Sequence, residues 1–225
     1  MVELQYFGHS FFKLKNKSGS ILIDPLFNET KTKLKKNKKI PVKKDTLKNI
    51  SLILLTSEME EHFDKEAVEK IAIENNAIVV ANDFILTDLN IPRCQKASVN
   101  PNGEIFLKGY KIKAMTAHHP QCFCPTGYLI DDGGTKIYHA GVTSLIDSFS
   151  SIKADVVLLP MNGKSMDVVD VVRATKIMKP KTVIPMQYDM FDFGNLDPKE
   201  LDRRIKDSVL KTETVILTPG KKIKV

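Results

Sequence analysis

The chain has 225 residues, of which 42% are hydrophobic and 27% are charged, and it carries a formal net charge of +7. This length and apolar content suffice for one substantial core, so we expect a single domain over residues 1–225. No stretch approaches the roughly 20 consecutive apolar residues of a membrane helix, and the first six residues lack the features of a signal peptide, which favours a soluble, cytoplasmic protein.

The cysteine content gives no sign of a disulfide framework. Cys94, Cys122 and Cys124 make an odd number, and the chain is too long to depend on disulfides for its stability. We therefore expect three reduced thiols.

The positive charge is concentrated in one segment, residues 31–44, which holds eight lysines and no acid. Without this segment the chain is nearly neutral. Like charges repel one another and resist burial, so the pattern predicts a solvated loop. Contact with a polyanion such as RNA is the alternative, although no aromatic residue is interleaved to stack on bases.

The first third of the chain predicts strands followed by a helix. Residues 2–8, 10–15 and 20–25 are short, apolar or β-branched segments, typical of a β-meander. A continuous apolar run at residues 51–56 is typical of a strand buried on both faces. The next segment, residues 63–75, has apolar residues at helical spacing and predicts a helix.

The rest of the chain repeats strands and helices. Residues 77–81 predict another buried strand, and turns at Lys108-Gly109 and Gly133-Gly134 predict antiparallel hairpins. Further along, the pattern predicts strands at residues 154–160 and 181–186 and helices at residues 166–180 and 197–210, the last with Pro198 in its first turn. Together these elements predict an α/β protein in which two sheets pack face to face under outer helices.

Seven short motifs occur in one order along nearly the whole chain. They are Gly8-His9-Ser10, ILIDP at Ile21–Pro25, LLT at Leu54–Thr56, GYLI at Gly127–Ile130, YHAG at Tyr138–Gly141, LLP at Leu158–Pro160 and IPM at Ile184–Met186. In this order they resemble the metal-dependent hydrolase branch of the metallo-β-lactamase superfamily, similar to L-ascorbate-6-phosphate lactonase. The resemblance implies a metallo-β-lactamase-like αββα four-layer sandwich.

The resemblance also implies a metal site, built on an H-x-H-x-D-H loop after LLT. Such a loop helps to hold two metal ions whose bridging water becomes hydroxide near neutral pH. In this chain Ser57 and Met59 take the places of the first two histidines and Glu61 takes that of the aspartate. Of the loop ligands, only His62 is retained.

The later ligand positions have changed as well. Val142 stands at the family's shared aspartate and Gln187 at its last histidine, while His118 or His119 remains for the third segment, with spacing in favour of His119. The resemblance therefore leaves Glu61, His62 and His119 as residual metal ligands. We expect no metal cofactor, or at most one zinc or manganese ion, with a thiol of Cys122 or Cys124 as an alternative further ligand.

Other polar residues have structural alternatives. His9 and His139 are typical of histidines that hydrogen-bond neighbouring loops, and Asp24 and Asp155 either orient histidines of the cleft or cap loops. Ser57 lies near His62 but has no G-x-S-x-G motif around it, which argues against a serine nucleophile.

Three hypotheses on function follow. The first is a non-catalytic homologue with a degenerate active site, a pseudoenzyme, that binds an unknown small molecule or protein in its cleft and has no catalytic residue. The second is a metal-dependent hydrolase of an ester, lactone or phosphoester with a rearranged mononuclear site. The third is a polyanion-associated or RNA-associated protein that uses the lysines of residues 31–44.

Overall fold

The computed structural model describes residues 2–27, 37–188, 190–191 and 196–225. Residues 31–36 of the predicted lysine loop lie outside the described residues. In the rest of that segment Lys38, Lys39 and Lys43 are exposed to solvent, as expected for a lysine-rich loop.

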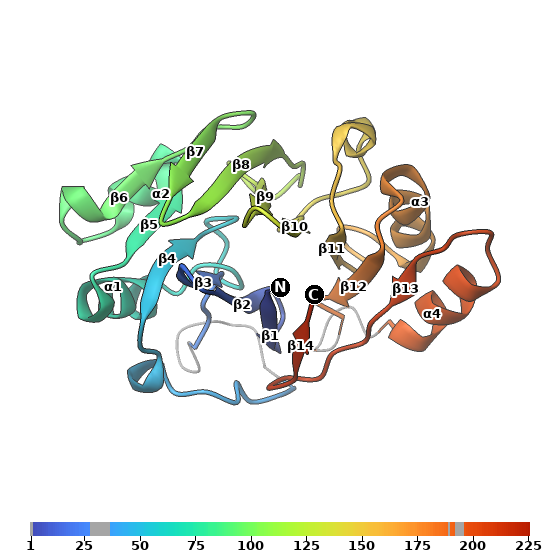
Figure 1. The fold of residues 1–225 in the computed structure, drawn as a ribbon, viewed down its shortest axis with the longest axis horizontal. Helices are drawn as coiled ribbons and strands as arrows, with labels where there is room; N and C mark the ends of the chain where they lie inside the picture. The colour runs from blue at the N-terminus through green and yellow to red at the C-terminus, as the bar shows by residue number, and fades with distance from the viewer. Residues whose placement is uncertain (1, 28–36, 189, 192–195) are drawn as a thin grey trace.

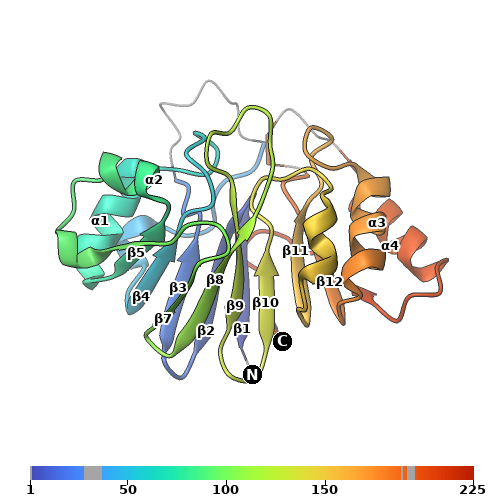
Figure 2. The same ribbon diagram turned by 90° about the horizontal axis from the view of Figure 1, so that it is seen from above.

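Fourteen described strands form two seven-stranded mixed sheets, which lie face to face (Figures 1 and 2). The first sheet has the order β14-β1-β2-β3-β4-β5-β6. Its strands are β1 (Glu3–Gly8), β2 (Phe11–Asn16), β3 (Gly19–Ile23), β4 (Ile50–Leu54), β5 (Ile78–Ala81), β6 (Lys96–Ser98) and β14 (Lys222–Lys224). The first meander is antiparallel, whereas β3, β4, β5 and β6 run parallel to one another.

The second sheet has the order β13-β12-β11-β10-β9-β8-β7. Its strands are β7 (Glu104–Leu107), β8 (Tyr110–Thr116), β9 (Thr126–Asp131), β10 (Lys136–His139), β11 (Val156–Pro160), β12 (Thr182–Met186) and β13 (Glu213–Thr214). Both predicted hairpin turns are present, and Lys108 and Gly109 have the positive φ values of 50° and 78° that such a tight turn requires.

Helices cover the outer faces of the sandwich, so the predicted αββα architecture is confirmed (Figure 2). Helices α1 (Lys65–Asn75) and α2 (Asp83–Asp88) lie over the first sheet, and α3 (Val168–Met178) and α4 (Pro198–Lys206) lie over the second. Short 3-10 turns at Lys44–Thr46, Arg93–Gln95 and Asp147–Ser151 join other elements. No helix in the described part of the chain is long and apolar enough to cross a membrane.

The central core lies between the two sheets. Alternate residues of each strand point inward, so that Leu4 and Phe12 of the first sheet meet Ile112 and Tyr128 of the second in one buried cluster. Two further clusters lie under the helices, one below α1 and one below α3. Burial of this kind fixes the strand register and with it the positions of the loops at the strand ends.

All four helices begin where capping chemistry indicates, and α2 follows Asn82, whose side chain accepts from the Ile85 backbone N–H. Asp64, Asp167 and Asp197 each accept a backbone hydrogen bond from the first turn of α1, α3 and α4, and Pro198 occupies the first turn of α4 as predicted. Helix α4 ends at Lys206, four residues before the predicted end. Helix α2 and strand β6 were not predicted, because neither is long enough to show a period.

Candidate functional site

The candidate site is built from loops at one end of the sandwich, where several strands end. Asp24 follows β3 with a φ of 46°, and Thr56 follows β4. Gly141, two residues beyond β10, approaches the same point: a Cβ there would lie 2.8 Å from both the Thr126 carbonyl oxygen and Thr56 Cβ. Glycine is therefore required for the loop after β10 to reach this point.

Asp24 and His62 form a buried pair at the bottom of the site. The distance between His62 Nδ1 and Asp24 Oδ2 is 2.8 Å, and both side chains are almost completely inaccessible to solvent. Asp24 Oδ1 also accepts a hydrogen bond from the backbone N–H of Thr56 at 2.8 Å. This arrangement places the imidazole proton on Nδ1 and leaves Nε2 as the hydrogen-bond acceptor of His62.

Gln187 is part of a second buried hydrogen-bond network, which meets the first at Ser10. Its Nε2 donates to Ser10 Oγ at 3.0 Å and to the Gly141 carbonyl oxygen at 3.1 Å. Its Oε1 accepts from Nδ2 of Asn162 at 2.9 Å. Ser10 Oγ in turn lies 3.1 Å from His62 Nδ1, so the two networks are joined.

His139 is a structural histidine, fully buried at the end of β10. Its Nδ1 accepts from the backbone N–H of Gly141 at 3.1 Å, so the proton lies on Nε2, which donates to the Ser10 carbonyl oxygen at 3.1 Å. Burial lowers the pKa of His139 to about 4. The ring is therefore neutral at physiological pH and ties the β1–β2 connection to the loop after β10.

His9 lies in the β1–β2 connection, with a φ of 52°. Its ring packs against the edge of His62, with ring centroids 5.1 Å apart, and against Phe191 at 4.9 Å. His9 thus lies beside the Asp24–His62 pair as part of the wall of the site.

Ser57, at the first histidine position of the family loop, contacts a cysteine. Its Oγ lies 3.1 Å from Cys122 Sγ, and the thiol donates to Glu58 Oε2 at 3.2 Å. Glu58 also accepts from the backbone N–H groups of Phe123 at 2.5 Å and Cys124 at 3.4 Å. Despite its partial burial, these hydrogen bonds lower the pKa of Glu58.

The same cluster keeps Cys122 protonated. Burial raises the pKa of Cys122 to about 12, and the neighbouring Glu58 carboxylate opposes ionisation further. Because the thiolate is the nucleophilic form, Cys122 is a weak nucleophile in this arrangement.

His119 lies close to the first network. Burial lowers the pKa of His119; Glu61 opposes this shift, whereas His62, His118 and Lys164 add to it. The structure thus brings Glu61, His62 and His119 into one neighbourhood. His119 Nδ1 accepts a weak hydrogen bond of 3.3 Å from the backbone N–H of Gln121, and this bond orients the His119 ring.

The donor set does not fit the two-metal centre of the family. Within the described ranges no three histidine, cysteine, aspartate or glutamate side chains are arranged to hold a metal ion. Val142 is 2% exposed and offers only methyl groups, and the side-chain oxygen of Gln187 is already bonded to Asn162. Two adjacent cations need several charged or imidazole ligands, which these positions do not supply.

Of the two roles expected for Asp155, the structure supports the loop cap and not the orientation of a histidine of the candidate site. It lies before β11, and it binds Lys181 Nζ at 2.8 Å and the Lys136 backbone N–H at 2.9 Å. The site is at the other end of that strand, beyond Pro160. The position of Asp155 before its strand, unlike that of Asp24 after its strand, is the sequence signal that separates the two.

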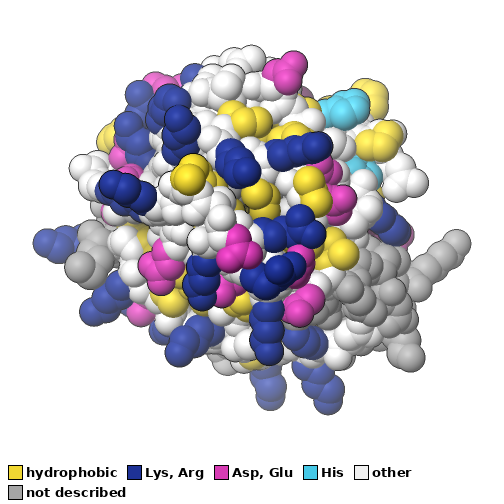
Figure 3. All heavy atoms as spheres, turned by 90° about the vertical axis from the view of Figure 1, so that its right-hand side faces the viewer, with side chains coloured by type: hydrophobic (Ala, Val, Ile, Leu, Met, Phe, Trp, Pro, Cys, Tyr) yellow, Lys and Arg dark blue, Asp and Glu magenta, His cyan; other side chains and the backbone are white. Residues whose placement is uncertain are grey.

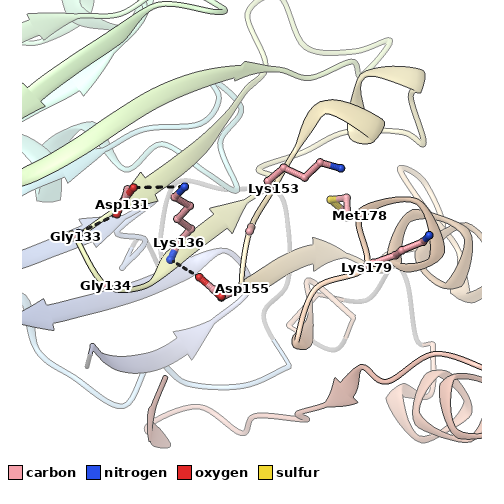
Figure 4. A pocket seen from close by; sticks show the side chains of 9 residues that line it. Asp131, Gly133, Gly134, Lys136, Lys153, Asp155, Met178 and Lys179 are labelled. Carbon is pink, nitrogen blue, oxygen red and sulfur yellow. Dashed lines mark hydrogen bonds and ion pairs between the residues drawn. The ribbon is translucent and has the colours of Figure 1, made fainter.

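The described cavities lie away from His62. One of them, with a volume of about 550 Å³, is bounded by the β9–β10 hairpin, the segment before β11 and the end of α3 (Figure 4). Lys136, Lys153 and Lys179 line it together with Asp131 and Asp155. Because β10 runs from this hollow toward His139, the hollow and the candidate site are at opposite ends of the second sheet.

Comparison with known proteins places the chain in a family. The Beta-lactamase superfamily domain matches residues 3–187. A UPF0173 metal-dependent hydrolase from Aeropyrum pernix is 30% identical, over 98% of this chain and 96% of the relative. One from Metallosphaera sedula is 29% identical, over 99% of both chains.

A solved structure supports the same family assignment. Igni18, described as a novel metallo hydrolase from the archaeon Ignicoccus hospitalis, is 26% identical and superposes with a TM-score of 0.82, over 99% of this chain and 97% of that one. The chain therefore belongs to the metallo-β-lactamase superfamily, as a homologue of its UPF0173 metal-dependent hydrolases.

Proposed function

We propose that this protein uses its cleft to bind a small molecule or a protein partner, without a two-metal centre and without hydrolysis. The observation that carries the proposal is the replacement of metal ligands by groups that complete hydrogen bonds inside the protein. Gln187 bonds to Ser10, Gly141 and Asn162, and Val142 is a buried side chain that carries only methyl groups. A degenerate active site explains both features.

Polar groups of the candidate site would contact such a ligand. Nε2 of His62 faces away from the Asp24 pair as an acceptor, and His119, with Lys164 in its electrostatic neighbourhood, offers a second imidazole. Because Asp24 fixes the orientation of His62, this acceptor is held in one position before a ligand arrives, which reduces the entropic cost of binding.

A metal-dependent hydrolase of an ester, lactone or phosphoester is the second candidate. The names of the UPF0173 relatives and of Igni18 support it, and so does the resemblance to L-ascorbate-6-phosphate lactonase. The Asp24–His62 pair supports it as well, because carboxylates commonly orient the histidine ligands of metals. Glu61, His62 and His119 would then hold one zinc or manganese ion.

Metal analysis separates the two candidates. Tag-free protein would be analysed by plasma mass spectrometry before and after equilibration with zinc and with manganese under reducing conditions, followed by gel filtration. Less than about a tenth of an equivalent of metal in every sample is the expected result. One tightly held ion per chain, absent in His62→Ala but retained in His118→Ala, would overturn the proposal in favour of the mononuclear hydrolase.

The same samples would be assayed for turnover of a p-nitrophenyl ester, a γ-lactone and bis(p-nitrophenyl) phosphate. No metal-stimulated turnover above the His62→Ala variant is expected. Turnover that requires added metal and is lost in both His62→Ala and His119→Ala would establish the second candidate.

A further inference from the structure

A lysine-rich surface lies on the outer face of the first sheet, away from the candidate site. The alternation of β1 and β2 sends Leu4, Tyr6, Phe12 and Leu14 into the core between the sheets. The residues between them face outward, and helices α1 and α2 lie over β4 to β6 instead (Figure 1). We call this outer surface of β14, β1 and β2 the basic face. Its lysines are Lys13, Lys15, Lys17, Lys222 and Lys224.

The strand register places these lysines in two rows across three strands. In one row Glu3 of β1 lies between Lys15 and Lys224. In the other, Gln5 of β1 lies between Lys13 and Lys222. Neighbouring strands are about 4.8 Å apart and alternate residues of one strand about 7 Å apart, so the four lysines project from a patch of nanometre size.

Acidic residues compensate little of this charge. Glu3 is the only acid among the residues that line the hollow on this face, and it is bonded to Lys222 at 3.1 Å. Asp132, from the other sheet, reaches the edge and accepts from Asn16 at 3.4 Å. Partial burial and the charges of Lys15 and Lys222 lower the pKa of Lys13, against the opposing effect of Glu3.

The surface of α4 shows the opposite pattern. There Glu200 binds both Arg203 and Arg204, and Lys206 binds Asp202. The face of the molecule seen in Figure 3 accordingly shows acidic side chains interspersed among the basic ones. The charges on this surface of α4 are therefore compensated to a greater extent than those of the basic face.

Protection of a sheet edge does not explain this pattern fully. Lysines on the edge strand β14 discourage pairing with another chain. However, Lys13 and Lys15 belong to β2, which is paired on both sides by β1 and β3. Edge protection therefore accounts for the lysines of β14 but not for Lys13 and Lys15, which the register places opposite Gln5 and Glu3 of β1.

The shape and composition of the basic face favour an extended anion. A hollow of about 380 Å³ lies among Glu3, Lys15, Asn16, Lys17 and Lys224. None of the exposed large hydrophobic residues identified in the described chain belongs to these strands. The face therefore offers no apolar group to insert into a lipid bilayer and no aromatic ring to stack on a base.

The lysine loop adjoins the same surface. Pro41 lies beside Gly220, since a Cβ on Gly220 would be 3.6 Å from the Pro41 ring, and β14 starts two residues later. The exposed Lys38, Lys39 and Lys43 belong to the loop segment that contains Pro41. The basic face thus adjoins a loop segment with three further exposed lysines.

We propose that the basic face binds the phosphodiester backbone of nucleic acid, without sequence specificity. Lysines act as mobile point charges toward phosphate, and each contact releases counterions from the nucleic acid. None of the large hydrophobic side chains that the structure shows as exposed lies on these strands, which favours this ligand over a membrane surface.

The test uses fluorescence anisotropy of a labelled 20-base-pair DNA duplex of arbitrary sequence, titrated with full-length protein at 50–300 mM KCl. One variant carries Lys13→Gln, Lys15→Gln, Lys222→Gln and Lys224→Gln. The control carries Lys153→Gln, Lys176→Gln, Lys199→Gln and Lys211→Gln, four exposed lysines elsewhere, and has the same net charge. A third carries Lys31→Gln, Lys33→Gln, Lys35→Gln and Lys36→Gln.

Wild-type protein should bind, with a log–log salt slope that becomes shallower by about 3 to 4 in the basic-face variant and stays nearly unchanged in the control. Equal losses in these two variants, loss only in the lysine-loop variant, or no binding at 50 mM KCl would overturn the proposal. So would binding to vesicles with 30% phosphatidylserine but not to DNA. If the fourfold variant does not fold, Glu3→Gln provides an independent test, because it should tighten DNA binding, and unchanged or weaker binding would contradict the proposal.

Discussion

Asn162 donates a hydrogen bond to Gln187, with 2.9 Å between Nδ2 and Oε1. This bond fixes the Gln187 amide with its NH2 group toward Ser10 and the Gly141 carbonyl oxygen. At the position where the family resemblance places a histidine ligand, the chain therefore has an amide whose oxygen is already used. Val142, which follows Gly141, stands where the family resemblance places the shared aspartate.

Restoring the missing ligands should restore metal binding. The variant Ser57→His, Met59→His, Glu61→Asp, Val142→Asp and Gln187→His rebuilds the family pattern around His62, and we expect it to retain about two zinc ions per chain after gel filtration. The physical reason is that four new ligands and a shortened carboxylate at residue 61 supply the charge and lone pairs that two cations need. Plasma mass spectrometry measures the metal, and zinc should also raise the Tm.

The control for this restoration is the same variant with His62→Ala, which should hold less metal. Val142→Asp alone should be destabilised by roughly 3 kcal/mol or more, because a buried carboxylate would lack a partner. A restored variant that folds and yet holds no metal would show that the loops themselves, and not only the ligand identities, have departed from a metal site.

Asp24 should contribute strongly to stability. Asp24→Asn removes the charge that accepts from Thr56 and from His62 Nδ1 at 2.8 Å, in a site with no solvent to replace it. We expect a loss of roughly 2–4 kcal/mol in the free energy of unfolding, measured by urea denaturation. Asp88→Asn, which breaks the exposed ion pair with Lys65, should cost less than about 1 kcal/mol. Equal effects would contradict the assigned importance of the buried pair.

Much of the fold could be predicted from the apolar segments that form its strands. Short apolar or β-branched segments predicted β1 and β2, and turn residues predicted the hairpins. Buried apolar runs predicted β4, β5, β11 and β12, because burial leaves a direct signal in the sequence. Helix α2, only six residues long, leaves almost none, although Asn82 before it is a favourable N-cap residue that accepts from Ile85.

For the candidate site, the motifs predicted which residues lie near one another but not which hydrogen bonds they form. The order of motifs indicated that His62 and His119 lie near one another, and the effect of His62 on the pKa of His119 agrees with this. The roles of Glu58 and Asn162 were missed. Glu58 binds residues 64 to 66 positions away, and Asn162 binds Gln187 25 positions away. Such partners depend on the tertiary arrangement of loops, for which one sequence has no periodic signal.

Stability should fall at mildly acidic pH through His139. Its folded-state pKa of about 4 lies below the ordinary value of 6.5, so between these values the unfolded chain binds the extra proton. The contribution is fully present above pH 6.5 and is lost as the pH falls toward 4. Between pH 7 and pH 5 it amounts to on the order of 2 kcal/mol. Urea unfolding at several pH values would measure it.

The His139 contribution is isolated by comparison with His139→Gln. Other groups titrate in the same range, so the relevant quantity is the difference in pH dependence between wild type and variant. The variant should be less stable at pH 7 and should lose less stability on acidification. Parallel pH profiles for the two proteins would contradict a neutral, buried His139.

Cys122 should react slowly with alkylating reagents. Its pKa of about 12 leaves a much smaller thiolate fraction at pH 8 than an ordinary cysteine has, by roughly a thousandfold, whereas Cys94 is exposed to solvent. Iodoacetamide treatment followed by peptide mass spectrometry should therefore label Cys94 well before Cys122. Glu58→Gln removes an adjacent negative charge and should speed the labelling of Cys122. Rapid labelling of Cys122 in native wild-type protein would contradict the hydrogen-bonded thiol.

Glu58 should hold the loop that carries His119 in place. Its carboxylate accepts from Cys122 and from the Phe123 and Cys124 backbones, and Phe123 itself is 76% exposed, so little apolar burial fixes this part of the loop. In Glu58→Gln the amide side chain retains a single acceptor oxygen and no charge, which weakens these bonds. We expect hydrogen exchange at Phe123 and Cys124 to rise about tenfold, as measured by mass spectrometry, with a global stability loss of about 1 kcal/mol.

Glu60→Gln, an exposed change two residues away, should leave exchange unchanged. If both variants exchange like wild type, the loop must be held by contacts other than Glu58, and the position of His119 in the cleft would not depend on this carboxylate.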